Sequence, residues 1–318
     1  MVKRIAVLTR DCAGINAAIR AVVRSADRRG IEVLGILRGF DGLMDGEFVV
    51  LNRRSVSGIV NLGGSILKTA RAKRFFDRSG RQKAIRFIRS RRIDGLVVIG
   101  GNGSMAGGHV LAAEQGIPVV GIPATIDNDI NGIDMAVGAD TAVNVAVDAL
   151  DKIRDTALSL ERIFVVEVMG RECGYIALQV ALAGGCEEVL LPERKFDLDK
   201  VVAEIEAARE RGKVSWIIIV AEGRAHASDV ADAITRITGY ETRIAVLGHI
   251  QRGGRPTAQD RILASRLGYA AVELIHGGAG DRCVVMKGNR TGSIALSTAV
   301  RPKKIDIEAE YRLIKILT

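Results

Sequence analysis

The sequence is poor in cysteine and in aromatic residues, and each shortage excludes a class of protein. The four cysteines, Cys12, Cys173, Cys186 and Cys283, are widely spaced and form no CxxC pair, so we expect reduced thiols and no cysteine metal cluster. Aromatic residues make up 4% of the 318 residues, which leaves few rings on which the bases of a single-stranded nucleic acid would stack.

Long apolar runs are also missing, so we expect no membrane partner. The amino terminus carries one basic pair, Lys3-Arg4, followed by a strand-like run and a loop, which differs from a signal peptide. We therefore expect a cytoplasmic protein.

The net charge of +9 would suit a nucleic acid or an anionic surface. The excess is spread along the chain, mainly as arginine, and small phosphorylated ligands explain clustered arginine better than nucleic acid does. The arginine-rich run at 86–92 needs no ligand, because the solvated face of a helix accounts for it. We expect no nucleic-acid partner.

Strand-like and helix-like segments alternate along the chain, which indicates parallel sheets covered by helices on both faces. At this length we predict an α/β protein with two doubly wound, three-layer αβα domains and mainly parallel sheets. The predicted strands are 5–8, 33–37, 96–99, 119–122, 163–168, 189–191, 216–220, 244–247 and 283–286, and the predicted helices are 16–29, 82–92, 105–115, 139–156, 175–183, 198–211, 229–237 and 258–275.

The segment 123–129, Pro-Ala-Thr-Ile-Asp-Asn-Asp, places two carboxylates at the carboxyl end of a predicted parallel strand. Open α/β sheets bind their ligands at this edge. One carboxylate, Asp127 or Asp129, can accept a proton from an attacking hydroxyl while the other holds a cation. An Asx-rich turn explains the same residues without any ligand.

Glycine-rich loops follow two other strands. Residues 100–104, Gly-Gly-Asn-Gly-Ser, open a helix, where backbone amides can approach an anion and Ser104 can cap the helix; a tight connection is the alternative. Residues 11–16 form a second loop from a strand to a helix, before Arg20 and Arg24. These two arginines lie four residues apart on one helical face and either grip phosphate or face water.

Three further segments concentrate cations beside glycine or on a loop. Residues 69–74 hold three cations in four residues, which suits a polyphosphate or an ordinary surface. Arg171 stands in a glycine-bracketed turn that ends a predicted strand. His249 and Arg252 lie on a glycine-flanked segment and, together with Arg243, look like a grip for a phosphosugar, although a lone histidine is usually structural.

Taken together, these segments resemble the 6-phosphofructokinase family over nearly the whole chain. The motifs at 123–129, 169–171 and 248–254 carry the resemblance. It implies an allosterically regulated kinase of glycolysis that transfers the terminal phosphoryl group of ATP, with magnesium, to O1 of fructose 6-phosphate. It also implies a homotetramer whose subunits each have two domains. These are an ATP-binding domain of residues 1–138 plus about 252–304 and a fructose 6-phosphate-binding domain of residues 139–251 plus about 305–318.

The resemblance assigns roles by position. Asp127 would take the proton from the sugar 1-hydroxyl, Thr125 would contact the transferred phosphoryl group, and Arg171 would stabilise its charge. Asp129 would help to hold magnesium. The sugar phosphate would be bound by Met169, Gly170, Glu222, His249 and Arg252, with Arg162 and Arg243 reaching it from a neighbouring subunit. ATP would lie on Gly103, Ser104 and Gly107, with Arg71, Lys73 and Arg74 near its phosphates and Phe40 near the base.

Two positions bear on the phosphoryl donor. Relatives that use pyrophosphate typically carry Asp where this chain has Gly103, and Lys where it has Ala124. An added carboxylate would crowd the α-phosphate of a nucleotide, so Gly103 and Ala124 favour ATP.

A regulatory pocket is also implied, because bacterial allosteric members bind ADP or phosphoenolpyruvate between subunits. Gly58 stands where some relatives carry an acidic residue, which leaves the effector open. The matching residues in this chain are Arg20, Arg24, Arg53, Arg154, Glu187, Arg211 and Lys213.

The chain departs from the family pattern at two places. The loop at 9–14 is about two residues shorter than the usual Gly-Gly-Asp-x-Pro-Gly, and Arg10, where small residues are expected, either binds phosphate or blocks the site. Asn102 replaces an Asp that helps to coordinate magnesium, and its amide oxygen is an uncharged ligand. Two alternatives therefore stay open, namely a pyrophosphate-dependent or other-sugar relative, and a catalytically weak regulatory paralogue that binds sugar phosphate or nucleotide.

Overall fold

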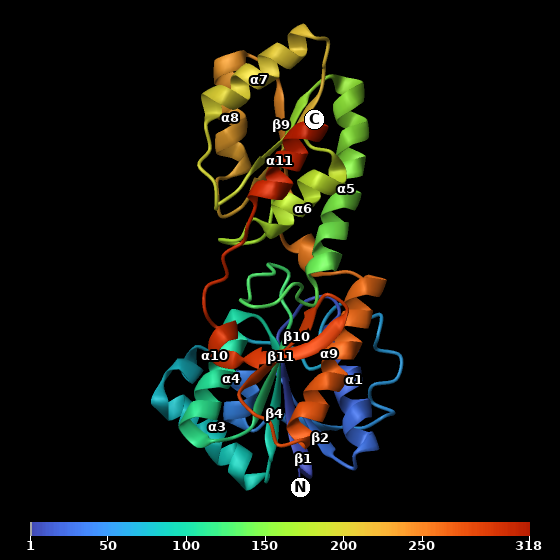
Figure 1. Cartoon of the computed structure of the whole chain (residues 1–318), viewed down its shortest axis with the longest axis vertical. Helices are drawn as coiled ribbons and strands as arrows, with labels where there is room; N and C mark the ends of the chain where they lie inside the picture. Colours follow the sequence, from blue (N-terminus) through green and yellow to red (C-terminus); the bar gives the residue numbers. More distant parts are fainter. Residues whose placement is uncertain (1) are drawn as a thin grey trace. The chain divides into compact units, whose positions relative to one another are not determined.

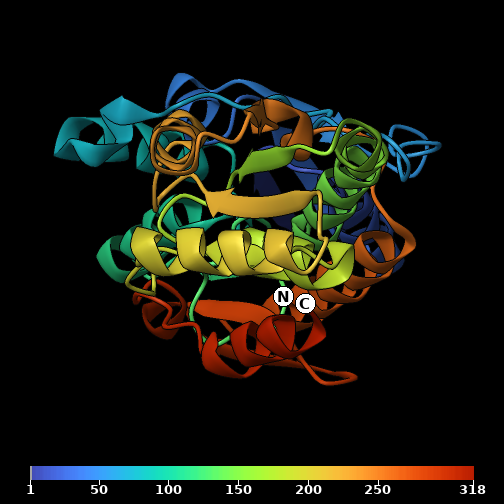
Figure 2. The same ribbon diagram turned by 90° about the horizontal axis from the view of Figure 1, so that it is seen from above.

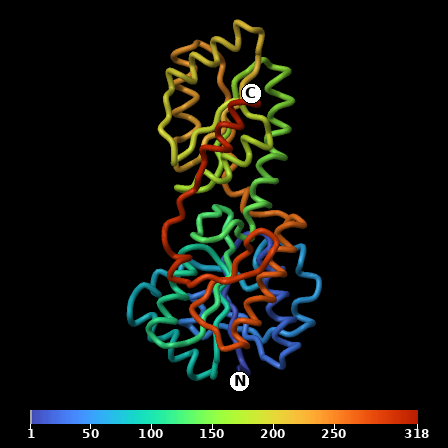
Figure 3. Tube along the Cα trace, in the orientation of Figure 1, coloured from blue at the N-terminus to red at the C-terminus, as the bar shows by residue number. Residues whose placement is uncertain are grey.

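The structure is a computed structural model that describes residues 2–318, and the chain divides into two compact units. Unit 1 comprises Met1–Thr141 and Arg252–Lys303, and unit 2 comprises Ala142–Gln251 and Lys304–Thr318. The chain therefore passes between the units at 141/142, 251/252 and 303/304. Figure 3 follows this path by colour, from the blue amino-terminal segment in unit 1 to the red carboxyl-terminal helix in unit 2.

Unit 1 is built on a seven-stranded sheet with the order β11-β10-β5-β4-β1-β2-β3. The five inner strands pair in parallel, whereas the edge strands β3 and β11 pair antiparallel with β2 and β10. The strands are β1 Arg4–Thr9, β2 Glu32–Ile36, β3 Phe48–Leu51, β4 Gly95–Gly100, β5 Val119–Pro123, β10 Arg282–Lys287 and β11 Arg290–Ala295.

Helices cover both faces of this sheet (Figure 1). On one face α1 (Ile15–Arg28) packs against α9 (Ala258–His276). On the other, alternate strand residues such as Leu8 and Val98 join one apolar core with the remaining helices. These helices are α2 Phe40–Asp45, the 3-10 turn η1 Lys73–Phe76, α3 Arg78–Ser90, α4 Asn102–Gln115 and α10 Leu296–Ala299.

Unit 2 contains a four-stranded parallel sheet with the order β7-β8-β6-β9. One face packs on α7 and α8 through a core that includes Val165, Ile205 and Ile218, and Figure 2 shows α7 (yellow) lying along the strands. Among the other helices of unit 2, α11 packs against α6. The elements are α5 Ala139–Leu160, β6 Ile163–Val168, α6 Tyr175–Gly184, β7 Glu188–Leu190, α7 Leu198–Glu210, β8 Trp216–Ala221, α8 Ala227–Thr238, β9 Thr242–Val246, the 3-10 turn η2 Gly248–Arg252 and α11 Glu308–Leu317.

A buried carboxylate joins the starts of α5 and α9. Asp260 is fully buried, and its Oδ1 accepts the Gly138 N–H while its Oδ2 accepts the Thr141 N–H, both at 2.8 Å. Burial raises the pKa of the Asp260 carboxyl. The three donors that it receives, including the Thr141 hydroxyl, offset part of the cost of burying the charge.

The structure confirms the predicted α/β class with mainly parallel sheets. It adds elements that the periodicity did not predict, among them α2, β3, β11 and α11. It also corrects one detail, since α4 begins at Asn102 with Gly101 as its N-cap and no side-chain cap, so Ser104 does not cap the helix.

The structure also shows the surroundings of the cysteines and of the arginine-rich run. All four cysteines are free and buried, and burial raises the pKa of Cys186 and Cys283 to about 12. The arginines at 86–92 are exposed, as a solvated helix face requires. Over the described residues 2–318, none of the helices is long and apolar enough to cross a membrane.

Candidate active site

The ends of β4 and β5 bring two of the predicted loops together in unit 1. Gly100 pairs with Pro123 in the parallel register, so the turn after β4 lies beside the segment after β5. A methyl group added at Gly101 would come within 3.3 Å of the Thr125 Cβ, and one at Gly100 within 2.5 Å of the Ser104 Oγ. A side chain at position 100 would therefore force its neighbours to shift, whereas one at position 101 would be a tight fit.

The carboxylate of Asp127 is held in this corner with little exposure to water. Asp127 as a whole is 3% exposed, and its N–H donates to the Thr125 Oγ1 at 3.3 Å. The next residue, Asn128, is also buried and has a φ of 50°, in the left-handed region. Asparagine tolerates that conformation better than most residues, which explains its place between two aspartates.

Asn102 and Asp129 form a pair that fits a cation. The Asn102 Nδ2 donates to the Asp129 carbonyl at 3.2 Å, so the Asn102 side chain lies against the Asp129 backbone. The Oδ1 atoms of both residues are buried and have no hydrogen-bond partner among the described residues. Magnesium needs only one or two protein oxygens beside water and substrate phosphates, so this pair suits it even though residues 2–318 contain no cluster of three or more His, Cys, Asp or Glu.

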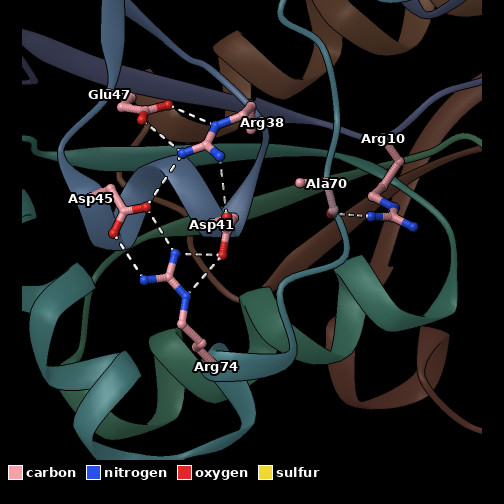
Figure 4. Close-up of polar contacts among 7 residues, drawn as sticks. All are labelled: Arg10, Arg38, Asp41, Asp45, Glu47, Ala70 and Arg74. Atoms are coloured by element: carbon pink, nitrogen blue, oxygen red, sulfur yellow. Dashed lines mark hydrogen bonds and ion pairs between the residues drawn. The ribbon is translucent and has the colours of Figure 1, made fainter.

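The shortened loop after β1 is tied to the segment at 65–70. The Arg10 Nη1 donates to the Ala70 carbonyl at 2.5 Å (Figure 4), and the Asp11 Oδ1 accepts the Ser65 N–H at 3.0 Å. The stem of Arg10 also passes close to Gly100, since a methyl group there would lie 2.9 Å from its Cγ. Arg10 thus lies between the turn after β4 and the segment that carries Arg71.

Two rings and a glycine come together beside α4. The centroids of Phe40 and Phe75 are 4.4 Å apart, and a methyl group added at Gly107 would meet the Phe40 ring at 2.9 Å and the Phe75 ring at 3.3 Å. Gly107 therefore lets α4 lie directly against this pair of rings. Phe75 was not among the predicted ATP-binding residues, because its position depends on this long-range contact.

The three cations at 71–74 have different surroundings. Arg71 and Lys73 are exposed, whereas Arg74 donates to Asp41 at 2.7 Å and to Asp45 at 2.8 Å in a cluster completed by Arg38 and Glu47 (Figure 4). These hydrogen bonds to Asp45 and Asp41 raise the pKa of the Arg74 guanidinium, and the Arg74 guanidinium lowers the pKa of Asp45. The Arg74 side chain is thereby directed to α2.

In unit 2 the turn after β6 is fixed by one carboxylate. The N–H groups of Gly170 and Arg171 both donate to the Glu222 Oε1, at 3.1 and 2.9 Å. Arg171 has a φ of 54°. Gly223 lies so close to the Arg171 carbonyl that a side chain at position 223 would collide with it. Met169 is buried, and its N–H donates to the Gln251 Oε1 at 2.8 Å. Glu222 therefore shapes this turn, and Gln251 is a support that sequence reasoning missed.

The predicted sugar-phosphate residues of unit 2 lie at two ends of its sheet. Arg162, just before β6, and Arg243, near the start of β9, both form ion pairs with Glu241, at 2.8 Å for Arg162. Gly170 and the exposed His249 follow the carboxyl ends of the same two strands. Because a six-residue strand spans roughly 20 Å, one chain does not bring the two groups together.

Comparisons with known proteins identify the family. Residues 4–275 match the phosphofructokinase family. The chain belongs to that family. It is 48% identical to the ATP-dependent 6-phosphofructokinase of Thermotoga neapolitana, with 99% of this chain and 100% of that protein covered, and 50% identical to that of Bacillus cytotoxicus, with 99% of both covered.

Solved phosphofructokinases share the fold. The enzyme from Saccharomyces cerevisiae matches with a TM-score of 0.89 and 32% identity, covering 99% of this chain and 48% of the yeast chain. A pyrophosphate-dependent phosphofructokinase from Marinobacter aquaeolei matches with a TM-score of 0.83 and 24% identity, covering 96% and 86% of the two chains. The second likeness supports the fold alone.

The predicted effector residues of this chain lie partly in each unit. In unit 2, Glu187, Arg211 and Lys213 line a hollow of about 560 Å³, with Lys213 paired to Glu187 at 2.8 Å. Arg154 donates nearby to the carbonyls of Gly184 and Gly185. In unit 1, Arg20 and Arg24 are half-buried on α1, and Arg53 pairs with Asp27 at 3.7 Å.

Proposed function

We propose that this chain transfers the terminal phosphoryl group of ATP to O1 of fructose 6-phosphate and releases fructose 1,6-bisphosphate and ADP. The main structural support is the buried Asp127 carboxylate at the carboxyl end of β5, beside the glycine-rich turn that opens α4. The near 50% identity to relatives named ATP-dependent 6-phosphofructokinase supports the donor and the reaction class.

Unit 1 would be the nucleotide-binding domain. Gly103 and Ser104 lie in the first turn of α4, where the positive end of the helix dipole favours phosphate. Gly107 and Phe40 would bind the base together with Phe75. Arg71 and Lys73 are exposed and suit the phosphates, whereas Arg74 would act by holding η1 on α2.

Asp129 and Asn102 would hold magnesium through their buried Oδ1 atoms. When bound, the cation would neutralise charge on the transferring phosphates. Because Asn102 contributes no charge, this chain supplies one charged ligand of the pair where the usual family pattern supplies two.

The transfer itself would depend on a few groups of this chain. Asp127 accepts the proton of the sugar 1-hydroxyl as O1 forms its bond to the γ-phosphorus and the bond to the bridging oxygen of ADP breaks. Thr125 contacts the moving phosphoryl group, and Arg171 stabilises its charge.

Unit 2 would hold the sugar phosphate. Met169, Gly170, Glu222 and His249 follow the carboxyl ends of its strands, and Arg252, the last residue of η2, is proposed as a further sugar-phosphate ligand. Arg162 and Arg243 lie at the opposite end of the same sheet, which fits their use by a neighbouring subunit in a homotetramer.

We also propose regulation by ADP or phosphoenolpyruvate. It is supported by the hollow beside Glu187, Arg211 and Lys213, whose cations suit a phosphorylated effector. Cytosolic residence is proposed on the same family grounds.

A coupled assay with fructose 6-phosphate and magnesium, run in parallel with ATP and with pyrophosphate, tests the function. ATP-dependent formation of fructose 1,6-bisphosphate is the expected result. Activity with pyrophosphate but not with ATP would show that pyrophosphate is the phosphoryl donor. Silence with both donors from a folded protein that still binds fructose 6-phosphate would favour a regulatory paralogue, for which the short loop with Arg10 is the main support.

A further inference from the structure

The carboxyl-terminal part of unit 1 returns to the segment that carries the two aspartates. Pro302 bridges Ile130 in antiparallel fashion, and the Asn131 Nδ2 donates to the Thr298 carbonyl at 3.1 Å. The chain from 298 to 303 is therefore held alongside residues 130–131. Neither the predicted site residues nor the family motifs include this stretch.

Lys303 reaches from this stretch into the loop between the aspartates. Its Nζ donates to the Asn128 carbonyl at 2.8 Å, in a part-buried position. Asn128 is the residue that separates Asp127 from Asp129. A positive charge thus contacts the residue that adjoins each of the two proposed functional carboxylates.

The contact completes the anchoring of Asn128. On the side-chain side, the Asn128 Oδ1 accepts the Ala136 N–H at 2.9 Å and its Nδ2 donates to the Asp134 carbonyl at 3.1 Å. On the backbone side, Lys303 holds the carbonyl. Because the φ of Asn128 is positive, the loop depends on such bonds to keep a conformation that few residues favour.

We propose that Lys303 is a positioning residue for phosphoryl transfer, which fixes the peptide between Asp127 and Asp129 by its charged hydrogen bond to the Asn128 carbonyl. This inference rests on the proposed function for its kinetic consequence. A rotation of that peptide would move both carboxylates, and transfer depends steeply on how such groups are placed. Lys303 is also the last residue of unit 1 before the chain enters unit 2.

The test compares Lys303→Met, which removes the charge and the donor at similar length, with Lys303→Arg and with Lys304→Met. Lys304 is the neighbouring, exposed lysine and serves as the matched control. We expect Lys303→Met to lower kcat by about 10- to 100-fold, the range of a lost hydrogen bond to a charged group. KM for both substrates should change less than about threefold, because the lysine acts through the loop. Lys303→Arg should recover most of kcat, and Lys304→Met should keep it.

Hydrogen exchange of the same variants tests the role of Lys303 without measuring the reaction. In Lys303→Met the amides of the segment at 127–137, including the Ala136 N–H, should exchange about tenfold faster or more, while the strands of both sheets keep their protection. Unchanged exchange in this segment, or a kcat within twofold of the parent, would overturn the proposal. A uniform rise in exchange over unit 1 would also overturn it, since Lys303 would then serve general stability. If the parent chain itself forms no fructose 1,6-bisphosphate, the proposed function fails while the exchange result still decides the role of Lys303.

Discussion

Two loops at the same edge of the seven-stranded sheet are built in different ways. The loop after β5 is held by two distant residues and by its own later part, because Asn102, Lys303 and Ala136 all bond to residues 128–129. The side chains of the loop after β1 bond mainly to one segment, residues 65–70, through Thr9, Arg10 and Asp11. The first loop keeps the family pattern and the second departs from it, so many independent anchors accompany the loop that would do the chemistry.

Asp127→Asn, in the better-anchored loop after β5, should have the largest effect on activity. The substitution keeps the volume of the side chain and removes the base, so kcat should fall by about 10²- to 10⁴-fold while KM for ATP changes little. Steady-state kinetics with both substrates varied measures this. Retention of more than a tenth of kcat would show that another group takes the proton.

Gly103→Asp tests the turn between the two loops. Nothing lies within 4 Å of a methyl group built at Gly103, so the variant should fold normally. Its carboxylate would repel the nucleotide phosphates, and kcat/KM for ATP should fall by about 100-fold or more, since like charges about 4 Å apart repel by about 4 kcal/mol at an effective dielectric constant near 20. Gly103→Ala is the matched control and should stay within about twofold. Equal losses in both variants would mean that bulk, and not charge, is excluded there.

Arg10→Ala breaks the main anchor of the shorter loop. If Arg10 supports the segment that carries Arg71, KM for ATP should rise by about tenfold, as expected for a lost hydrogen bond from a charged donor, and kcat should change less. The exposed Arg78→Ala on α3 controls for the loss of one positive charge. A lower KM in Arg10→Ala would instead identify Arg10 as a block on the site.

Asn102→Asp should have the smallest effect on activity. It tests the proposed cation ligands at position 102 and Asp129. A second carboxylate beside Asp129 should lower the magnesium concentration for half-maximal activity by about threefold, because ligand charge increases affinity. The variant also loses the donor to the Asp129 carbonyl, which should cost about 1 kcal/mol in unfolding free energy. Magnesium titration and chemical denaturation measure the two effects. An unchanged magnesium requirement would exclude Asn102 as a ligand.

The sequence predicts the central strands well because they are buried apolar runs. The strand at 163–168 is found with the bounds predicted for it. The edge strands β3 and β11 were missed, since Val49 and Val50 are exposed and β11 has a partly polar sequence with a glycine, so neither shows the pattern of a buried strand. The helix α11 was missed as well, and within it only Ile314 is buried.

The candidate site shows the same limit at the level of side chains. Motifs and resemblance identify Asp127, Asp129 and the turn at 100–104, because these follow strands directly. They do not predict that Arg74 points to α2, or that Phe75, Gln251 and Lys303 support the proposed site residues. Each of those contacts joins segments far apart in the sequence, so no local pattern encodes it.

The division of unit 1 into two stretches of chain has a consequence for synthesis on the ribosome. The strand β5 is made long before β10, the neighbour that covers its open side, and the donors of Asp260 at 138 and 141 precede that carboxylate by more than a hundred residues. Until residue 287 has emerged, the nascent chain carries an uncovered inner strand of the kind that invites pairing with other chains. A message truncated after unit 2's first stretch would thus yield an aggregation-prone product in which neither unit is complete.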